Sequence, residues 1–127
     1  MDREELQRRS MELSLSILRL VRNLPFRVDT HIVGKQVLRS ATSIASNYRA
    51  ALRARSRAEF YSKLCIVVEE SDETCFWLEI MRRSGMTDEK EVVMLMQECM
   101  DLLRIFSVTR KTTQLNMIAH RESKIKK

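Results

Sequence analysis

The sequence predicts an all-α protein, an antiparallel up-down-up-down four-helix bundle that forms oligomers. The chain has 127 residues but only two glycines and one proline, so turn-forming residues are scarce and long helices are favoured over a sheet. Apolar residues make up 44% of the chain, which suffices for the core of one domain. Four segments with helical apolar periodicity are joined by short connections, which make consecutive helices antiparallel neighbours.

The first helix is expected over residues 2–23. Leu13, Ile17 and Leu20 recur at helical spacing and predict one buried face. Pro25 follows closely and disfavours helical geometry at the residue before it. The helix therefore ends near that point.

The second helix is expected over residues 30–54, with Asp29 or Thr30 as its N-terminal cap. Small residues at its inner positions would let neighbouring helices approach closely. They are Ser40, Ala41, Ser43, Ala45 and Ser46.

The third helix is expected over residues 57–84. Ser56 and Glu59 have the spacing of a capping box, in which the serine accepts from the third helical amide and the glutamate answers the cap's own amide. Gly85 is a natural left-handed C-terminal residue. A heptad seam predicts the buried face, yet further apolar residues lie outside it, which indicates a central helix or a contact with another subunit. The outer residues are Tyr61, Cys65, Ile66, Val68, Phe76, Trp77 and Ile80.

The fourth helix is expected to begin after Thr87 as its cap and to end near Met117. Residues 1–119 then form the bundle. Residues 120–127 are predicted to be a basic, flexible tail.

Charge is distributed unevenly along the chain, whose formal net charge is +6. Residues 1–63 hold 13 basic against 6 acidic side chains, residues 64–103 hold 3 against 10, and residues 104–127 hold 7 against 1. An acidic segment between two basic segments favours internal pairing, with surplus positive charge left for a partner.

The densest positive charge lies between the second and third helices. Four arginines, Arg49, Arg53, Arg55 and Arg57, occur within nine residues that contain no acid, and Lys63 follows. Such a cluster at a helix junction predicts binding of a polyanion such as RNA or DNA. Clustered charges are also often only a solvated surface, and this reading stays open.

Five polar residues are expected to form a structural polar core between the second and third helices. If the chain folds back near Arg55, the hairpin places Arg39 and Gln36 beside Glu70 and Glu73. Asn47 is the fifth member. If the arginine–glutamate pair is buried, breaking it would cost about 3–5 kcal/mol. The same carboxylates could instead be a catalytic acid and base, although the structural role is preferred.

The sequence predicts no catalytic residues, metal site or cofactor, and hence no enzyme. Neither histidine has a glutamate three residues before it, and both glycines stand alone, so a di-metal motif and a phosphate loop are absent. The three cysteines match no zinc spacing and indicate reduced thiols of a cytoplasmic protein. No apolar run exceeds five residues, so no membrane span is expected.

Residues 36–47, with the pattern Gln-x-x-Arg-Ser-Ala-x-Ser-Ile-x-x-Asn, resemble a family of bacterial four-helix-bundle proteins. The similarity includes residues 24–25, 55–60 and 70–73 and covers roughly residues 6–106. This family includes the rRNA intervening-sequence proteins and the accessory variability determinant of diversity-generating retroelements. Its common form has an acid and a glycine three and four positions after the asparagine, where this chain has Ala50 and Ala51.

The resemblance implies a barrel-like homopentamer. For the retroelement branch it also implies a basic surface that binds nucleic acid and a reverse transcriptase as partner. The leading hypothesis is therefore an oligomeric, non-enzymatic module that binds nucleic acid with little sequence specificity. Tyr48 and Tyr61 flank the arginines and could stack on bases, although packing is the commoner role of such residues. The alternative is a protein-interaction scaffold with no nucleic-acid role. A bundle that binds a metal or a small molecule is a third reading, which rests on fold analogy alone.

Overall fold

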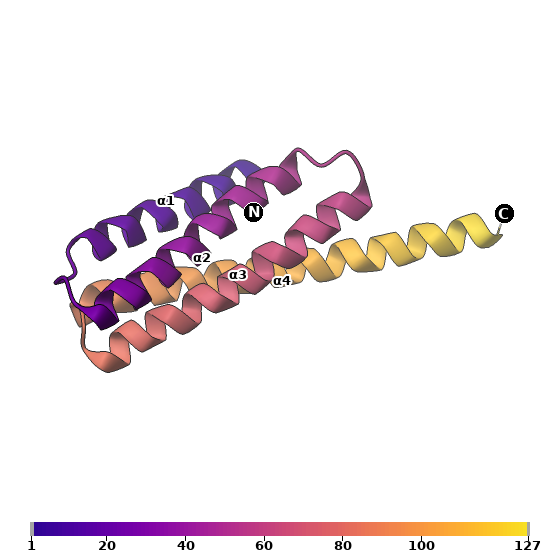
Figure 1. Ribbon diagram of the computed structural model, residues 1–127. Helices are drawn as coiled ribbons and strands as arrows, with labels where there is room; N and C mark the ends of the chain where they lie inside the picture. The colour runs from indigo at the N-terminus through magenta and orange to yellow at the C-terminus, as the bar shows by residue number, and fades with distance from the viewer. Residues whose placement is uncertain (1, 127) are drawn as a thin grey trace.

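The computed structural model describes residues 2–126 and contains four α-helices: α1 (Arg3–Arg22), α2 (Val28–Leu52), α3 (Arg57–Ser84) and α4 (Glu89–Lys126). No strand occurs within the described residues, so the all-α class is confirmed. The helix α2 contacts α1 and α3, and α4 contacts α3 and α1, so the four helices pack as one bundle (Figure 1).

Local hydrogen bonds explain where α3 begins and ends. The Ser56 hydroxyl accepts a hydrogen bond from the Glu59 amide at 3.0 Å, as predicted for the cap. The Glu59 carboxylate accepts from the Arg55 amide at 3.4 Å. Glu59 was predicted to accept from the amide of Ser56, so this part of the prediction was wrong by one residue. Gly85 ends the helix with φ 70°, the left-handed conformation predicted for it.

The start of α2 differs from the prediction. The helix begins at Val28, so Asp29 and Thr30 lie inside its first turn instead of capping it. The Thr30 hydroxyl accepts from the Arg27 amide at 3.0 Å and donates to the carbonyl of Pro25. These hydrogen bonds join the connection before α2 to the first turn of that helix. They depend on how the chain turns between α1 and α2 as well as on the local sequence.

The bounds of α4 also differ from the prediction. The helix begins at Glu89, so Asp88 and not Thr87 directly precedes it. It continues to Lys126 instead of ending near Met117, because this segment contains no glycine or proline to stop it. The predicted flexibility of residues 120–127 stays a prediction, and residue 127 lies outside the described residues.

The apolar seams of the four helices meet in one continuous core. Burying such seams together is what stabilises helices that would be marginal alone. Among the small residues predicted to face inward on α2, Ser46 is exposed and Ser43 is half-buried. The apolar side chains with no exposed surface are Ile17, Val37, Ala41, Ile44, Leu64, Val67, Leu78, Met81, Val92, Cys99, Leu102 and Phe106.

Small hydroxyl side chains are buried where α2 meets its neighbours. The Thr74 hydroxyl donates to the Ser40 hydroxyl at 2.8 Å across α2 and α3. The Ser14 hydroxyl donates to the Ala41 carbonyl at 3.0 Å across α1 and α2. Because these side chains are short, the helix backbones approach closely while each buried polar atom keeps a partner.

The last part of α4 projects beyond the other three helices, past the connection between α2 and α3 (Figure 1). Most side chains in residues 111–125 are exposed. No helix within the described residues is long and apolar enough to cross a membrane.

Candidate functional site

The connection between α2 and α3 lies at the end of the bundle from which α4 projects, here called the α2–α3 end (Figure 1). The four clustered arginines of the sequence all lie there and are all exposed. Arg49 is in the last turn of α2, Arg53 follows its end, Arg55 is in the connection and Arg57 begins α3. We call these four residues the arginine surface.

Three of the four arginines share one concavity. Arg49, Arg53 and Arg55 line a surface hollow of about 410 Å³, together with Glu59. Within residues 2–126, no ion pair involves any residue of the arginine surface. Three arginines and one acid therefore line the same space, and the guanidinium groups keep their hydrogen-bond donors available for a ligand.

The other two predicted binding residues lie apart from this hollow. Arg57 lines a neighbouring hollow of about 260 Å³ with Arg3 and Phe60. The Arg3 guanidinium lies 5.3 Å from the centre of the Phe60 ring, within the range of a cation–π contact. Lys63 is half-exposed on α3 and lines neither hollow.

The last part of α4 adds positive charge at the same end. Arg110 lies close enough to Tyr61 of α3 to affect its hydroxyl electrostatically. Beyond it, Lys111, Arg121 and Lys124 are exposed. The sequence contained this signal as the basic block after residue 104. Only the length and direction of α4 bring that block to the α2–α3 end of the bundle (Figure 1).

The two tyrosines that flank the arginines differ in exposure. Tyr48 is 2% exposed, and its ring centre lies 5.0 Å from that of Phe106. It is a core residue, so the suggestion that it stacks on bases is wrong. Tyr61 is half-exposed on α3, and its pKa lies above the ordinary value because of a hydrogen bond with Cys65.

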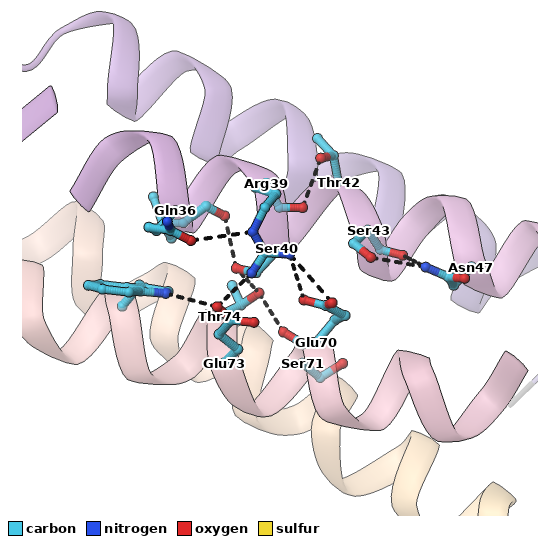
Figure 2. Close-up of polar contacts among 12 residues, drawn as sticks. Gln36, Arg39, Ser40, Thr42, Ser43, Asn47, Glu70, Ser71, Glu73 and Thr74 are labelled. Carbon is cyan, nitrogen blue, oxygen red and sulfur yellow. Dashed lines mark hydrogen bonds and ion pairs between the residues drawn. The ribbon is translucent and has the colours of Figure 1, made fainter. Parts of the chain in front are cut away.

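The predicted polar core is a network at the edge of the α2–α3 interface (Figure 2). The Arg39 guanidinium donates to the Glu70 carboxylate at 3.4 Å and to the Glu73 carboxylate at 2.5 Å. Its Nε donates to Gln36 at 3.3 Å, and the Trp77 indole donates to Glu73 at 3.3 Å. The hairpin therefore brings Arg39 to both carboxylates that its position in the sequence suggested.

The position of this network inside the bundle was predicted wrongly. The Arg39 side chain is 47% exposed, against 18% for Glu70 and 38% for Glu73. Long charged side chains reach from a helix interface to water. The interior positions are occupied instead by hydroxyls such as Ser40 and Thr74. Removal of Arg39 should therefore cost less stability than the loss of one partner of a buried ion pair would.

The two carboxylates of the network differ in proton affinity. Burial raises the pKa of Glu70 above its ordinary value, against the opposing effect of Arg39. The hydrogen bond from Arg39 lowers the pKa of Glu73. Asn47 is not part of this network: it is half-buried on α2 and donates to the carbonyl and hydroxyl of Ser43, both at 2.9 Å.

The described residues contain no cluster of three or more histidine, cysteine, aspartate or glutamate side chains that could hold a metal ion. Glu70 and Glu73 both accept hydrogen bonds from Arg39 (Figure 2). What the geometry supplies at the α2–α3 end is a concave group of cations suited to a polyanion.

Comparisons with known proteins identify relatives by sequence and by structure. A protein-family model described as 23S rRNA-intervening sequence protein matches residues 3–107. A solved structure from Bacteroides thetaiotaomicron VPI-5482, described as a protein of unknown function from the S23 ribosomal protein family, is 30% identical with a TM-score of 0.80. That similarity covers 87% of this chain and 99% of the other. The comparison with curated proteins finds no match.

The family match ends within α4, at residue 107, so the last part of that helix lies outside it. The arginine surface lies inside the match, and the exposed basic residues Lys111, Arg121 and Lys124 lie outside it.

Proposed function

This chain belongs to the 23S rRNA-intervening sequence protein family, and from that premise we propose that it is a non-enzymatic helical bundle that binds nucleic acid. The observation that carries the proposal is the hollow shared by Arg49, Arg53 and Arg55, three exposed cations in no ion pair within residues 2–126. Arginine is suited to phosphate because its planar fork donates two parallel hydrogen bonds.

The physical basis of the proposed binding is counterion release. Each arginine that contacts a phosphate frees a condensed cation, so affinity falls steeply as salt rises. Binding should depend little on base sequence, because contacts of arginines with phosphates carry no information on base identity. The family description concerns ribosomal RNA, which makes RNA the first ligand to test.

The proposal includes an antiparallel bundle. It is supported by contacts whose residue numbers rise on one helix as they fall on its neighbour. Between α1 and α2, Ser14 contacts Ala41, and a side chain placed at Gly34 would contact Val21. Between α3 and α4, Cys75 contacts Cys99, and Arg82 pairs with Glu89.

We also propose that the protein is an oligomer. Among the outer apolar residues predicted on α3, Val68 is buried in the chain's own core and Phe76 is 52% exposed. On α4, Met94, Met100 and Val108 are exposed as well. Such residues are suited to a contact between copies, and each added copy would repeat the arginine surface. The pentamer is implied by the family resemblance alone. Sedimentation at micromolar concentration should give several times the mass of one chain, and a clean monomer would contradict this.

The decisive experiment compares two variants that each lose four arginines. One is Arg49→Ser/Arg53→Ser/Arg55→Ser/Arg57→Ser. The control is Arg22→Ser/Arg27→Ser/Arg82→Ser/Arg83→Ser at the opposite end of the bundle, where the removed residues are also exposed. Labelled RNA and DNA are titrated between about 50 and 200 mM salt.

The first variant should bind about a hundredfold more weakly at low salt and lose up to roughly three units of slope in log affinity against log salt. The control should retain most of both quantities. Equal losses in the two variants would mean that net charge alone accounts for the effect on affinity. Absence of binding by the wild type at low salt would instead favour a protein-interaction scaffold, whose basic surface meets an acidic protein.

Association with a reverse transcriptase is a separate hypothesis, supported only by the resemblance to the retroelement branch. The proposal places the protein in the cytoplasm, which its three free cysteines support. The proposed binding of nucleic acid does not require a protein partner.

A further inference from the structure

Two of the three cysteines face each other in the middle of the α3–α4 interface. The Sγ atoms of Cys75 on α3 and Cys99 on α4 are 3.0 Å apart, although the residues are 24 positions apart in the chain. A disulfide has an S–S distance of about 2.05 Å, so a shift of about an ångström would join them. Cys65 is the third cysteine.

The surroundings of the two thiols differ. Cys99 has no exposed surface, and its thiol lies 3.4 Å from the carbonyl of Ser71, to which it can donate. Cys75 is only partly buried, so it is the more accessible of the two to a small solute. One thiol is therefore placed to meet an oxidant and the other to react with the product.

The acidities of the thiols fit this division. The pKa of Cys75 lies below its ordinary value because of its side-chain hydrogen bond with Cys99. The pKa of Cys99 is raised by the same neighbour and by burial. Since the thiolate is the nucleophile, Cys75 is the group that reacts first.

We propose that Cys75 and Cys99 form an oxidant-sensitive dithiol, which a hydroperoxide converts into an intrachain disulfide between α3 and α4. The Cys75 thiolate attacks a peroxide oxygen, the O–O bond breaks, and Cys75 becomes a sulfenic acid as the released hydroxide takes up a proton. The Cys99 thiol then gives up its proton and attacks the Cys75 sulfur, and the S–O bond breaks with loss of water. With hydrogen peroxide, two thiols and one peroxide yield one disulfide and two waters.

The bond would fix α3 to α4, the helix that projects at the α2–α3 end (Figure 1). The inference does not depend on nucleic-acid binding, because it rests on the placement of the two sulfur atoms inside one chain.

The test treats the full chain with hydrogen peroxide, blocks the remaining thiols with N-ethylmaleimide and measures the intact mass without reduction. The reduced chain should carry three adducts, one for each free cysteine. The oxidised chain should carry one adduct and have lost two hydrogen atoms. Peptide mapping should place the single adduct on Cys65, and dithiothreitol should restore all three.

Matched variants identify the pair. Cys65→Ser should oxidise like the wild type, whereas Cys75→Ser should form no intrachain disulfide. Because Cys75 is partly exposed, its substitution tests the proposal without opening the core at Cys99. Three reactive thiols after oxidation would overturn the proposal. So would a bond that joins two chains, a bond through Cys65, or oxidation of Cys75 to sulfinic acid without a disulfide.

A thermal measurement tests whether the native geometry accepts the bond. The oxidised wild type should melt roughly 5–10 °C above the reduced form. The melting temperature of oxidised Cys75→Ser should not rise. A lower melting temperature for the disulfide form would mean that the bond distorts the bundle, which contradicts the inferred fit.

Discussion

The two ends of the bundle carry similar sets of exposed arginines in different surroundings. At the α2–α3 end, the described residues form no ion pair with Arg49, Arg53, Arg55 or Arg57. At the opposite end, where α1 meets α2 and α3 meets α4, three arginines pair with acids (Figure 1). These pairs are Arg27 with Asp29, Arg82 with Glu89, and Arg83 with Glu79.

The difference separates charge that is satisfied within the chain from charge that is available to a ligand. A paired arginine loses an existing contact when it binds a phosphate, whereas an unpaired arginine gives up only water. The last part of α4, which carries exposed basic residues, also extends from the α2–α3 end (Figure 1). The same residue type therefore has different expected roles at the two ends.

The largest expected effect tests whether both ends are firmly packed. Tyr48→Ala removes a ring that is 2% exposed and packs on Phe106, and it should reduce the free energy of unfolding by about 3–5 kcal/mol. Leu20→Ala, at a buried position nearer the opposite end, should cost about 2–5 kcal/mol. Urea denaturation measures both. If Tyr48→Ala alone reduced the free energy of unfolding by less than about 1 kcal/mol, the α2–α3 end would be loosely packed.

Removal of the projecting helix should weaken nucleic-acid binding with little effect on stability. A chain that lacks residues 112–127 loses exposed cations but few buried contacts, so affinity at low salt should fall by about tenfold. Its melting temperature should stay close to that of the full chain. Arg121→Gln/Lys124→Gln keeps the helix and should reproduce part of the loss. Unchanged affinity in both variants would restrict binding to the arginine surface.

Paired and unpaired arginines should differ in stability. Arg39→Ala breaks contacts with two partly buried carboxylates and should cost about 1 kcal/mol. Arg83→Ala breaks an exposed pair within one helix and should cost about 0.5 kcal/mol or less. Arg53→Ala removes no ion pair and should leave the urea midpoint almost unchanged. If Arg39→Ala costs 3 kcal/mol or more, roughly the value for a buried pair, its network behaves as an interior one.

The smallest expected effect concerns the acid in the arginine hollow. Glu59→Gln removes the negative charge that lines this space with Arg49, Arg53 and Arg55, so RNA affinity should rise by about threefold at low salt. Glu79→Gln at the opposite end is the control and should leave affinity unchanged. Lower affinity for Glu59→Gln would mean that Glu59 orients the arginines through its contact with the Arg55 amide.

The sequence by itself determined the four helices, the cap at Ser56, the end of α3 at Gly85 and most of the buried seam. These features depend on neighbours within one or two turns, where periodicity and capping act. The approach of Arg39 to Glu70 and Glu73 could also be predicted from the sequence, because a short connection fixes which residues of a hairpin lie opposite each other.

Only the tertiary structure decided the rest. It turned Tyr48 inward, placed Arg39 at the edge of the interface, and gave the interior positions to hydroxyls such as Ser40 and Thr74. It also brought Cys75 to Cys99 and carried the end of α4 past the connection between α2 and α3 (Figure 1). These outcomes depend on the rotation and relative length of packed helices, which distant side chains fix jointly and local patterns do not encode.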